Sequence, residues 1–221
     1  MREQIINTVR EKKIIVIARG IEKKMLIPLA EALYEGGIRL LETTYSPDGK
    51  ISDEETAENI KMLSSHFDGR MYIGAGTVLT EKQIELTKNA GGKFIISPDT
   101  NGAVIKKTRE LGMVSIPGAL TPREVQSAHL YGADFVKLFP LTGNAAEYIK
   151  AVKAPLKHIP LLAVGGVTVE NVEEFFSAGA VGFGIGSAIA KGSEVEKFET
   201  DEDFDIITER VKKFVSAIEN A

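Results

Sequence analysis

Residues 133–140 read Ala133-Asp134-Phe135-Val136-Lys137-Leu138-Phe139-Pro140, an apolar run that follows a glycine and ends at a proline. Such a run is typical of a parallel strand that is buried on both faces. Lys137 lies inside it, and burying an ammonium group is costly unless the group is paired or loses its proton. An uncharged amine is a nucleophile that forms Schiff bases with carbonyl carbons. Alternatively, the side chain extends from the strand end to water or pairs with a carboxylate, and this stretch alone leaves both interpretations open.

The pattern around this strand recurs along the chain, because a helix-like segment repeatedly ends in glycine and an apolar run follows at once. Eight runs are predicted as strands, at residues 14–18, 38–42, 71–76, 93–97, 113–116, 133–140, 160–164 and 181–185. Strands that alternate with helices in this way are typical of parallel strand–helix–strand units. Eight units predict a (β/α)8 TIM barrel. An open doubly wound sheet is the alternative, because spacing alone does not establish closure.

The ends of the helices and the last part of the chain complete this prediction. Thr80, Thr121 and Thr168 precede predicted helices and are expected to cap them. Residues 193–203 are acidic and poor in apolar side chains, which predicts an exposed loop. Apolar residues then recur at helical spacing, which predicts a helix at about residues 204–219 that closes the barrel. Residues 1–221 are therefore expected to form one barrel domain.

The composition excludes several classes of function. The formal net charge of the 221-residue chain is -4, which does not favour nucleic-acid or anionic-membrane partners. The chain has no cysteine, and this excludes disulfides, cysteine catalysis and thiolate metal sites. No apolar segment is long enough to span a bilayer, and the N-terminus does not read as a secretory leader. A cytoplasmic protein is expected.

Two charged residues interrupt the predicted strands near their carboxyl ends, where the active site of a (β/α)8 barrel lies. Glu42 ends the second strand, and Lys137 lies near the end of the sixth. A carboxylate and an amine at one barrel mouth could form a structural ion pair. They could also serve as a proton-transfer group and a Schiff-base nucleophile, and their position at strand ends favours this second interpretation.

Glycines follow the seventh and eighth strands, as Gly165-Gly166 and as Gly184-Ile185-Gly186-Ser187. Glycines allow backbone N–H groups to approach an anion, and the N-termini of the following helices favour negative charge. Phosphate is commonly bound at this place in barrels. Either glycine pair alone would fit a turn, and Ser187 would fit a helix N-cap, but together they predict a phosphate site.

Two further polar residues follow strands, and neither has a single interpretation. Arg19 could bind an anionic substrate group or form a surface or interface salt bridge, and Thr77 could donate to a carboxylate or form a hydrogen bond within its loop. His66, His129 and His158 fall on predicted helix surfaces or connections, and we interpret them as structural. No cluster has metal-ligand spacing, so a reaction without a metal or cofactor is expected.

Several stretches together resemble the 2-keto-3-deoxy-6-phosphogluconate aldolase family, whose members also cleave 6-phosphogalactonate or 4-hydroxy-2-oxoglutarate substrates. The matching stretches cover most of the chain up to about Gly192, in order: residues 36–44, 73–79, 94–98, 116–118, 136–140, 164–167 and 184–187. The resemblance implies a class I aldolase that needs no cofactor and forms a homotrimer. It implies a phosphorylated keto acid as the substrate and pyruvate as a product.

The resemblance also implies a role for each matching residue. Lys137 matches the Schiff-base lysine, and Glu42 matches the acid/base that works through a water. The residues implied to bind the substrate are Arg19, Thr77, Pro98 and Val164. Those implied to bind phosphate are Gly165, Gly166, Gly186 and Ser187.

Two departures from the family pattern concern the substrate. Many members carry an arginine four residues after the glutamate, where this chain has Ser46, so Arg19, Thr77 or Lys50 is expected to hold the carboxylate. Gluconate-type members often have Thr-Gly-Gly after strand seven, whereas this chain has Val164-Gly165-Gly166, as galactonate-type members do. The lost hydroxyl leaves the C4 epimer open. An unphosphorylated 4-hydroxy-2-oxo acid and a non-catalytic, phosphate-binding barrel are the alternative functions.

Overall fold

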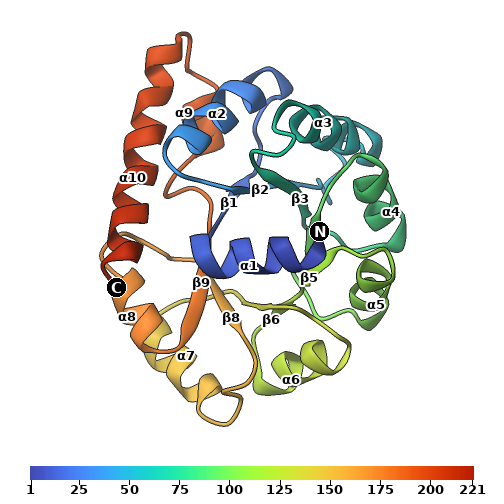
Figure 1. Ribbon diagram of the computed structural model, residues 1–221, viewed down its shortest axis with the longest axis vertical. Coiled ribbons are helices and arrows are strands. Elements are labelled where there is room, and N and C mark those ends of the chain that lie inside the picture. Colours follow the sequence, from blue (N-terminus) through green and yellow to red (C-terminus); the bar gives the residue numbers. More distant parts are fainter.

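A ring of parallel strands forms the centre of the computed structural model, which describes residues 1–221, and helices surround it (Figure 1). The hydrogen-bonded order is β5-β4-β3-β2-β1-β9-β8-β7-β6. The strands are β1 (Ile14–Ala18), β2 (Leu40–Thr44), β3 (Tyr72–Gly76), β4 (Phe94–Ile96), β5 (Val114–Ile116), β6 (Gly118–Ala119), β7 (Val136–Leu138), β8 (Leu161–Val164) and β9 (Ala180–Ile185).

The two ends of this order, β5 and β6, are separated in the chain by Pro117 alone. They are two halves of the fifth barrel strand, since proline has no N–H with which to continue a ladder. The first half pairs with β4 and the second with β7, so the chain itself joins the ends of the sheet. The predicted (β/α)8 barrel is confirmed.

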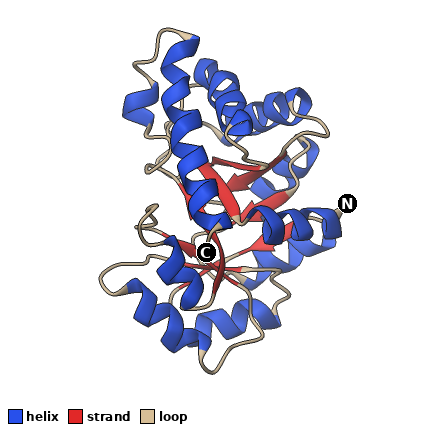
Figure 2. Ribbon diagram, turned by 60° about the vertical axis from the view of Figure 1, so that its left-hand side comes forward, coloured by secondary structure: helices blue, strands red, loops and turns tan.

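Helices follow the strands and form an outer layer, which Figure 2 shows from the side. Two of the expected N-caps are present as capping boxes, Thr80 with Gln83 and Thr121 with Glu124. The helices are α1 (Arg2–Lys12), α2 (Lys23–Glu35), α3 (Asp53–His66), α4 (Glu81–Asn89), α5 (Gly102–Glu110), α6 (Pro122–Leu130), α7 (Ala145–Lys153), α8 (Val172–Ser177), α9 (Gly192–Val195) and α10 (Asp205–Glu219), with a 3-10 turn at Asp201–Phe204. None is long and apolar enough to cross a bilayer.

Two sequence predictions about local structure are wrong. Thr168 does not cap a helix, because α8 begins only at Val172 and Asn171 occupies the N-cap position. Residues 193–203 are not simply an exposed loop, because they include most of α9 and part of the 3-10 turn, and Val195 is fully buried. A helix of four residues is too short to show the periodicity by which helices are recognised in a sequence.

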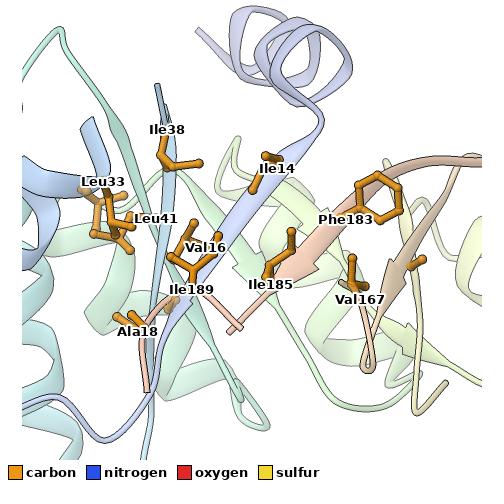
Figure 3. Close-up of a cluster of buried hydrophobic side chains, with 14 of the residues drawn as sticks. Ile14, Val16, Ala18, Leu33, Ile38, Leu41, Val167, Phe183, Ile185 and Ile189 are labelled. Carbon is orange, nitrogen blue, oxygen red and sulfur yellow. The ribbon is translucent and has the colours of Figure 1, made fainter. Parts of the chain in front are cut away.

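The barrel interior is packed by placing large side chains against glycines of the neighbouring strand. A Cβ atom added to Gly74 would overlap the ring of Phe94, and one added to Gly184 would lie 2.8 Å from Cγ2 of Val164. The outward side chains of the strands form a separate layer beneath the helices. Figure 3 shows part of this layer, including Ile14, Val16 and Ala18 of β1, Leu33 of α2, and Phe183 and Ile185 of β9.

The helix that lies across the end of the barrel is α1 (Figure 1), at the amino ends of the strands. Ile5, Ile6 and Val9 of α1 share one apolar cluster with the first residues of β2, β4 and β5. Asp134, just before β7, holds this helix by accepting hydrogen bonds from Arg2 and from the Ser115 N–H. By contrast, α10 contacts α2 and α8 and completes the outer ring, with Ile207 and Val211 buried. Neither α1 nor α10 therefore lies across the carboxyl end of the barrel, where the candidate site is located.

Candidate active site

Lys137 lies at the centre of β7, the sixth strand of the barrel, and only 5% of its surface is exposed. Its register places it beside Gly118 of β6 and Leu162 of β8. The nitrogen lies 4.5 Å from the centre of the Phe139 ring, two residues along the chain. Burial lowers the pKa of Lys137, the negative charge of Glu42 opposes this, and the positive charge of Arg19 adds to it. The amine is therefore shifted toward its uncharged, nucleophilic form.

Glu42 lies on β2, with 1% of its surface exposed, and neither carboxylate oxygen has a hydrogen-bond partner in the protein. Burial raises the pKa of Glu42, although the positive charges of Lys137 and Arg19 work against that shift. No salt bridge within 4.0 Å joins Glu42 to either cation. The structural ion pair considered from the sequence is absent. What the barrel holds is a carboxyl group and an amine that are close enough to interact electrostatically and both shifted toward their neutral forms.

Gly76 makes room for the Glu42 side chain, because a Cβ atom at Gly76 would overlap Oε1 of Glu42. The φ angle at Gly76 is not positive, so an alanine backbone is tolerated there and only the methyl group causes a conflict. We expect Gly76→Ala to displace the carboxyl group and to lower kcat by on the order of 100-fold, since small displacements of catalytic groups have effects of that size. Steady-state kinetics would measure this loss. Full activity in a folded Gly76→Ala variant would contradict the placement of Glu42.

A pocket of about 560 Å³ opens beside Lys137 at the carboxyl ends of β1, β7, β8 and β9. Seven of the residues predicted from the sequence line it: Arg19, Lys137, Val164, Gly165, Gly166, Gly186 and Ser187. Glu42, Thr77 and Pro98 are not among the lining residues. Glu42 is buried within the barrel. The carbonyl oxygen of Pro98 lies against Gly118, which is the strand partner of Lys137.

Thr77 contacts the pocket through Arg19, because Nη2 of Arg19 donates a hydrogen bond of 3.3 Å to Oγ1 of Thr77. Thr77 has a φ of 57°, a conformation that is strained for a β-branched residue. Ser46 and Lys50 are directed elsewhere, since Ser46 donates to Asp48 and the Lys50 ammonium lies 2.9 Å from the same carboxylate. Lys50 does not line the pocket, whereas Arg19 does, and Arg19 lies close enough to Lys137 for its charge to lower the pKa of that amine.

Two glycine-containing loops, one after β8 and one after β9, line another part of the pocket. Gly165 and Gly166 have φ angles of 102° and 64°, which favour glycine and turn the chain after β8. Asn171 fixes this turn, because its side chain accepts from the Thr168 N–H at 2.9 Å and donates to the Gly166 carbonyl at 2.8 Å. The second loop, after β9, contributes Gly186 and Ser187 together with Ala188, Ala190, Lys191 and Gly192.

Three residues of the site were not predicted from the sequence: two line the pocket, and the third bonds to one of its glycine loops. Phe139 is one of them, although it belongs to the stretch that was recognised first and its position two residues after Lys137 places it on the same side of the extended chain. The others are Asn171 and Lys191, which lie in loops without a recognisable motif. No group of three or more histidine or acidic residues is arranged to hold a metal ion. Of the histidines, His66 bonds Glu31, and the rings of His129 and His158 pack on each other.

Residues 5–209 match the family model described as KDPG and KHG aldolase, in which KDPG is 2-keto-3-deoxy-6-phosphogluconate. The chain belongs to this family. The resemblance read from the sequence is therefore confirmed, and the chain is an aldolase, a carbon–carbon lyase.

The aldolase is similar to several known proteins. The probable 2-dehydro-3-deoxy-6-phosphogalactonate aldolase of Rhizobium meliloti is 34% identical over 82% of this chain and 83% of its own. The 2-dehydro-3-deoxy-6-phosphogalactonate aldolase of Escherichia coli is 32% identical over 83% of this chain and 88% of its own. Among solved structures, the KDPG aldolase of Legionella pneumophila, captured with pyruvate as a covalent carbinolamine, has a TM-score of 0.78. It is 26% identical and covers 94% of this chain and 96% of its own.

Proposed function

We propose that this aldolase cleaves a 2-keto-3-deoxy-6-phospho sugar acid, of the gluconate or galactonate type, to pyruvate and glyceraldehyde 3-phosphate. The observation that supports this most is Lys137, a buried amine with a lowered pKa whose nitrogen adjoins a pocket ending in two glycine loops. A Schiff-base lysine must be unprotonated to attack a ketone, and the burial of Lys137 favours that state.

The proposed reaction begins when the Lys137 nitrogen adds to the C2 ketone, and loss of water gives an iminium ion. Glu42, through a water molecule, accepts the proton of the C4 hydroxyl group as the C3–C4 bond breaks. The bond electrons move into the iminium group and form an enamine, while glyceraldehyde 3-phosphate leaves. Glu42 then returns the proton to C3 of the enamine, again through water. Hydrolysis of the resulting iminium releases pyruvate and regenerates Lys137.

The remaining residues are proposed to hold the two charged ends of the substrate. Arg19, oriented by its hydrogen bond with Thr77, would bind the carboxylate, and Pro98 would shape the pyruvate end indirectly, through its contact with Gly118 beside Lys137. The backbone N–H groups near Gly165, Gly166 and Gly186, with the hydroxyl of Ser187, would bind the phosphate. Val164 would lie near C4, where it offers no hydroxyl to distinguish the epimers, so both are proposed substrates.

A second candidate function is cleavage of an unphosphorylated 4-hydroxy-2-oxo acid such as 4-hydroxy-2-oxoglutarate, because the matching family model covers both activities. It would use Lys137 and Glu42 in the same way, but the glycine loops would have no phosphate to bind.

A pyruvate-release assay across both phosphorylated epimers and their dephosphorylated forms tests these functions. We expect kcat/KM to favour a phosphorylated substrate by about 100-fold or more, because two charge-assisted hydrogen bonds contribute about 3 kcal/mol or more. Equal values would favour the unphosphorylated substrate. Thermal stabilisation by these ligands without pyruvate release would indicate a non-catalytic binding barrel.

We also propose that the protein is cytoplasmic and acts as a homotrimer without nucleic-acid or membrane partners. The trimer is proposed from the family resemblance. Each chain has a mass of 24.0 kDa, so a mass by light scattering that corresponds to one or two chains would contradict the trimer.

A further inference from the structure

The loop after β9, residues 186–192, forms one side of the pocket, and its position is set by contacts outside the pocket. Gly186, Ser187, Lys191 and Gly192 line the pocket, whereas Ile189 is fully buried on the other side of the loop. Gly192 lies close to the turn after β1, because a Cβ atom there would come within 2.6 Å of the Gly20 carbonyl oxygen. The position of this loop therefore also affects the backbone next to Arg19.

Arg210 on α10 connects this loop to the outer ring of helices. One guanidinium nitrogen, Nη1, donates to the Ile189 carbonyl at 3.2 Å and to Oε2 of Glu194 at 2.7 Å. The other, Nη2, donates to Oε1 of Glu194, also at 2.7 Å. A planar two-point pair of this kind fixes orientation as well as distance. Arg210 thus holds both the loop and the helix α9 that follows it.

The ion pair is partly shielded from water, because the side chains of Arg210 and Glu194 are 29% and 33% exposed. The hydrogen bonds from Arg210 lower the pKa of Glu194, so the carboxylate stays charged and paired near neutral pH. Neither residue lines the pocket. Arg210 is also one residue beyond the segment that matches the family model.

We propose that Arg210 is a positioning residue for the anion-binding loop, and that it sets the affinity for the phosphorylated end of the substrate without touching it. The inference rests on the proposed function. Asn171 fixes the other glycine loop through its own hydrogen bonds, so each side of the phosphate site has a separate support. Losing the contacts of Arg210 frees the backbone N–H groups near Gly186 and Ser187 from the geometry that binds an anion.

The rest of α10 stays attached without Arg210. Val211, Phe214 and Ile218 are buried, and the Thr208 hydroxyl donates to the Ala32 carbonyl at 3.0 Å. An Arg210→Ala variant is therefore expected to fold.

The test compares the full-length protein with Arg210→Ala, using phosphorylated and dephosphorylated substrate and inorganic phosphate as a competing anion. We expect KM for the phosphorylated substrate and the inhibition constant of inorganic phosphate both to rise by about tenfold, since small displacements of binding groups have large effects. KM for the dephosphorylated substrate and borohydride trapping of pyruvate should be unchanged. Arg210→Lys, which keeps the charge but not the two-point geometry, should lie between wild type and Arg210→Ala.

Lys212→Ala is the matched control, because it removes an exposed pair with Glu209 on the same helix and should change none of these constants. Unchanged constants for phosphate and phosphorylated substrate in Arg210→Ala would overturn the inference. An equal loss with every substrate, together with a lower Tm, would also overturn it, because it would indicate a structural role alone. If Arg210→Ala does not fold, Glu194→Gln removes the charge of the ion pair while Arg210 keeps its bond to the Ile189 carbonyl, and a smaller rise in the same two constants is expected. If the wild-type protein fails to prefer the phosphorylated substrate, the proposed function itself is wrong.

Discussion

Lys137→Ala should abolish turnover and covalent capture of pyruvate together. In wild type, pyruvate followed by borohydride should add mass to the peptide that contains Lys137, and the variant should show no addition. We expect kcat to fall by on the order of 10⁶-fold, since removing a nucleophile causes losses of that order in other enzymes. Lys137 is 5% exposed and forms no salt bridge, so its removal breaks no ion pair, and the loss of its positive charge shifts the buried Glu42 further toward its neutral form.

Mass spectrometry of the trapped protein would make this measurement, and Lys191→Ala is the matched control. Lys191 lines the same pocket but is exposed to solvent rather than buried on a strand, so pyruvate capture should persist without it. Equal labelling of wild type and Lys137→Ala would rule out the Schiff-base role.

Glu42→Gln should lower kcat by about 100- to 10,000-fold, the usual contribution of a positioned acid or base. Pyruvate trapping should be retained more fully than turnover, because the nucleophile is still present. The two substitutions therefore separate capture of the keto acid from cleavage of the C3–C4 bond.

The pH dependence gives a second readout for Glu42. The proposed base must be ionised, and burial raises its pKa, so wild-type activity should fall on the acid side at a pH where an ordinary glutamate is still fully ionised. The lowered pKa of Lys137 acts in the other direction, because it makes the free amine available at a lower pH than an ordinary lysine would. Glu42→Gln should remove the fall on the acid side of the pH–activity profile, because that fall is caused by protonation of the carboxyl group. An unchanged pH profile at full activity would show that another group moves the proton.

Much of the barrel was predictable because its strands, caps and glycines are local features of the sequence. The lysine strand is one apolar run, and Thr80 and Thr121 carry their capping partners three residues later. Contacts between distant strands were not predictable, because they depend on register. The Glu42 side chain, for example, lies against Gly76 only because β2 and β3 pair in the register that the structure shows.

The residues that hold the pocket loops in place were not predictable from the sequence for a similar reason. Arg210 and Glu194 come from a long helix and a four-residue helix, and only their relative positions in the fold reveal the pair. The role of α1 was not foreseen either. Polar residues surround its three apolar side chains in the sequence, so the sequence did not indicate that these side chains cover the strands. Thr168 resembled an N-cap, but Asn171 uses the Thr168 N–H to fix the preceding turn instead.

The position of α1 has a consequence for the order of events. Ile5, Ile6 and Val9 cover the amino end of the barrel, and the pocket beside Lys137 opens at the carboxyl end, so we expect substrate and products to enter and leave at the carboxyl end. Lys137 is buried, whereas Gly165, Gly186 and Ser187 are partly or fully exposed, so the pyruvate that we propose is attached to Lys137 should be the last part of the substrate to leave. In the synthetic direction the same geometry requires pyruvate to load before the aldehyde, which would otherwise stand in its path.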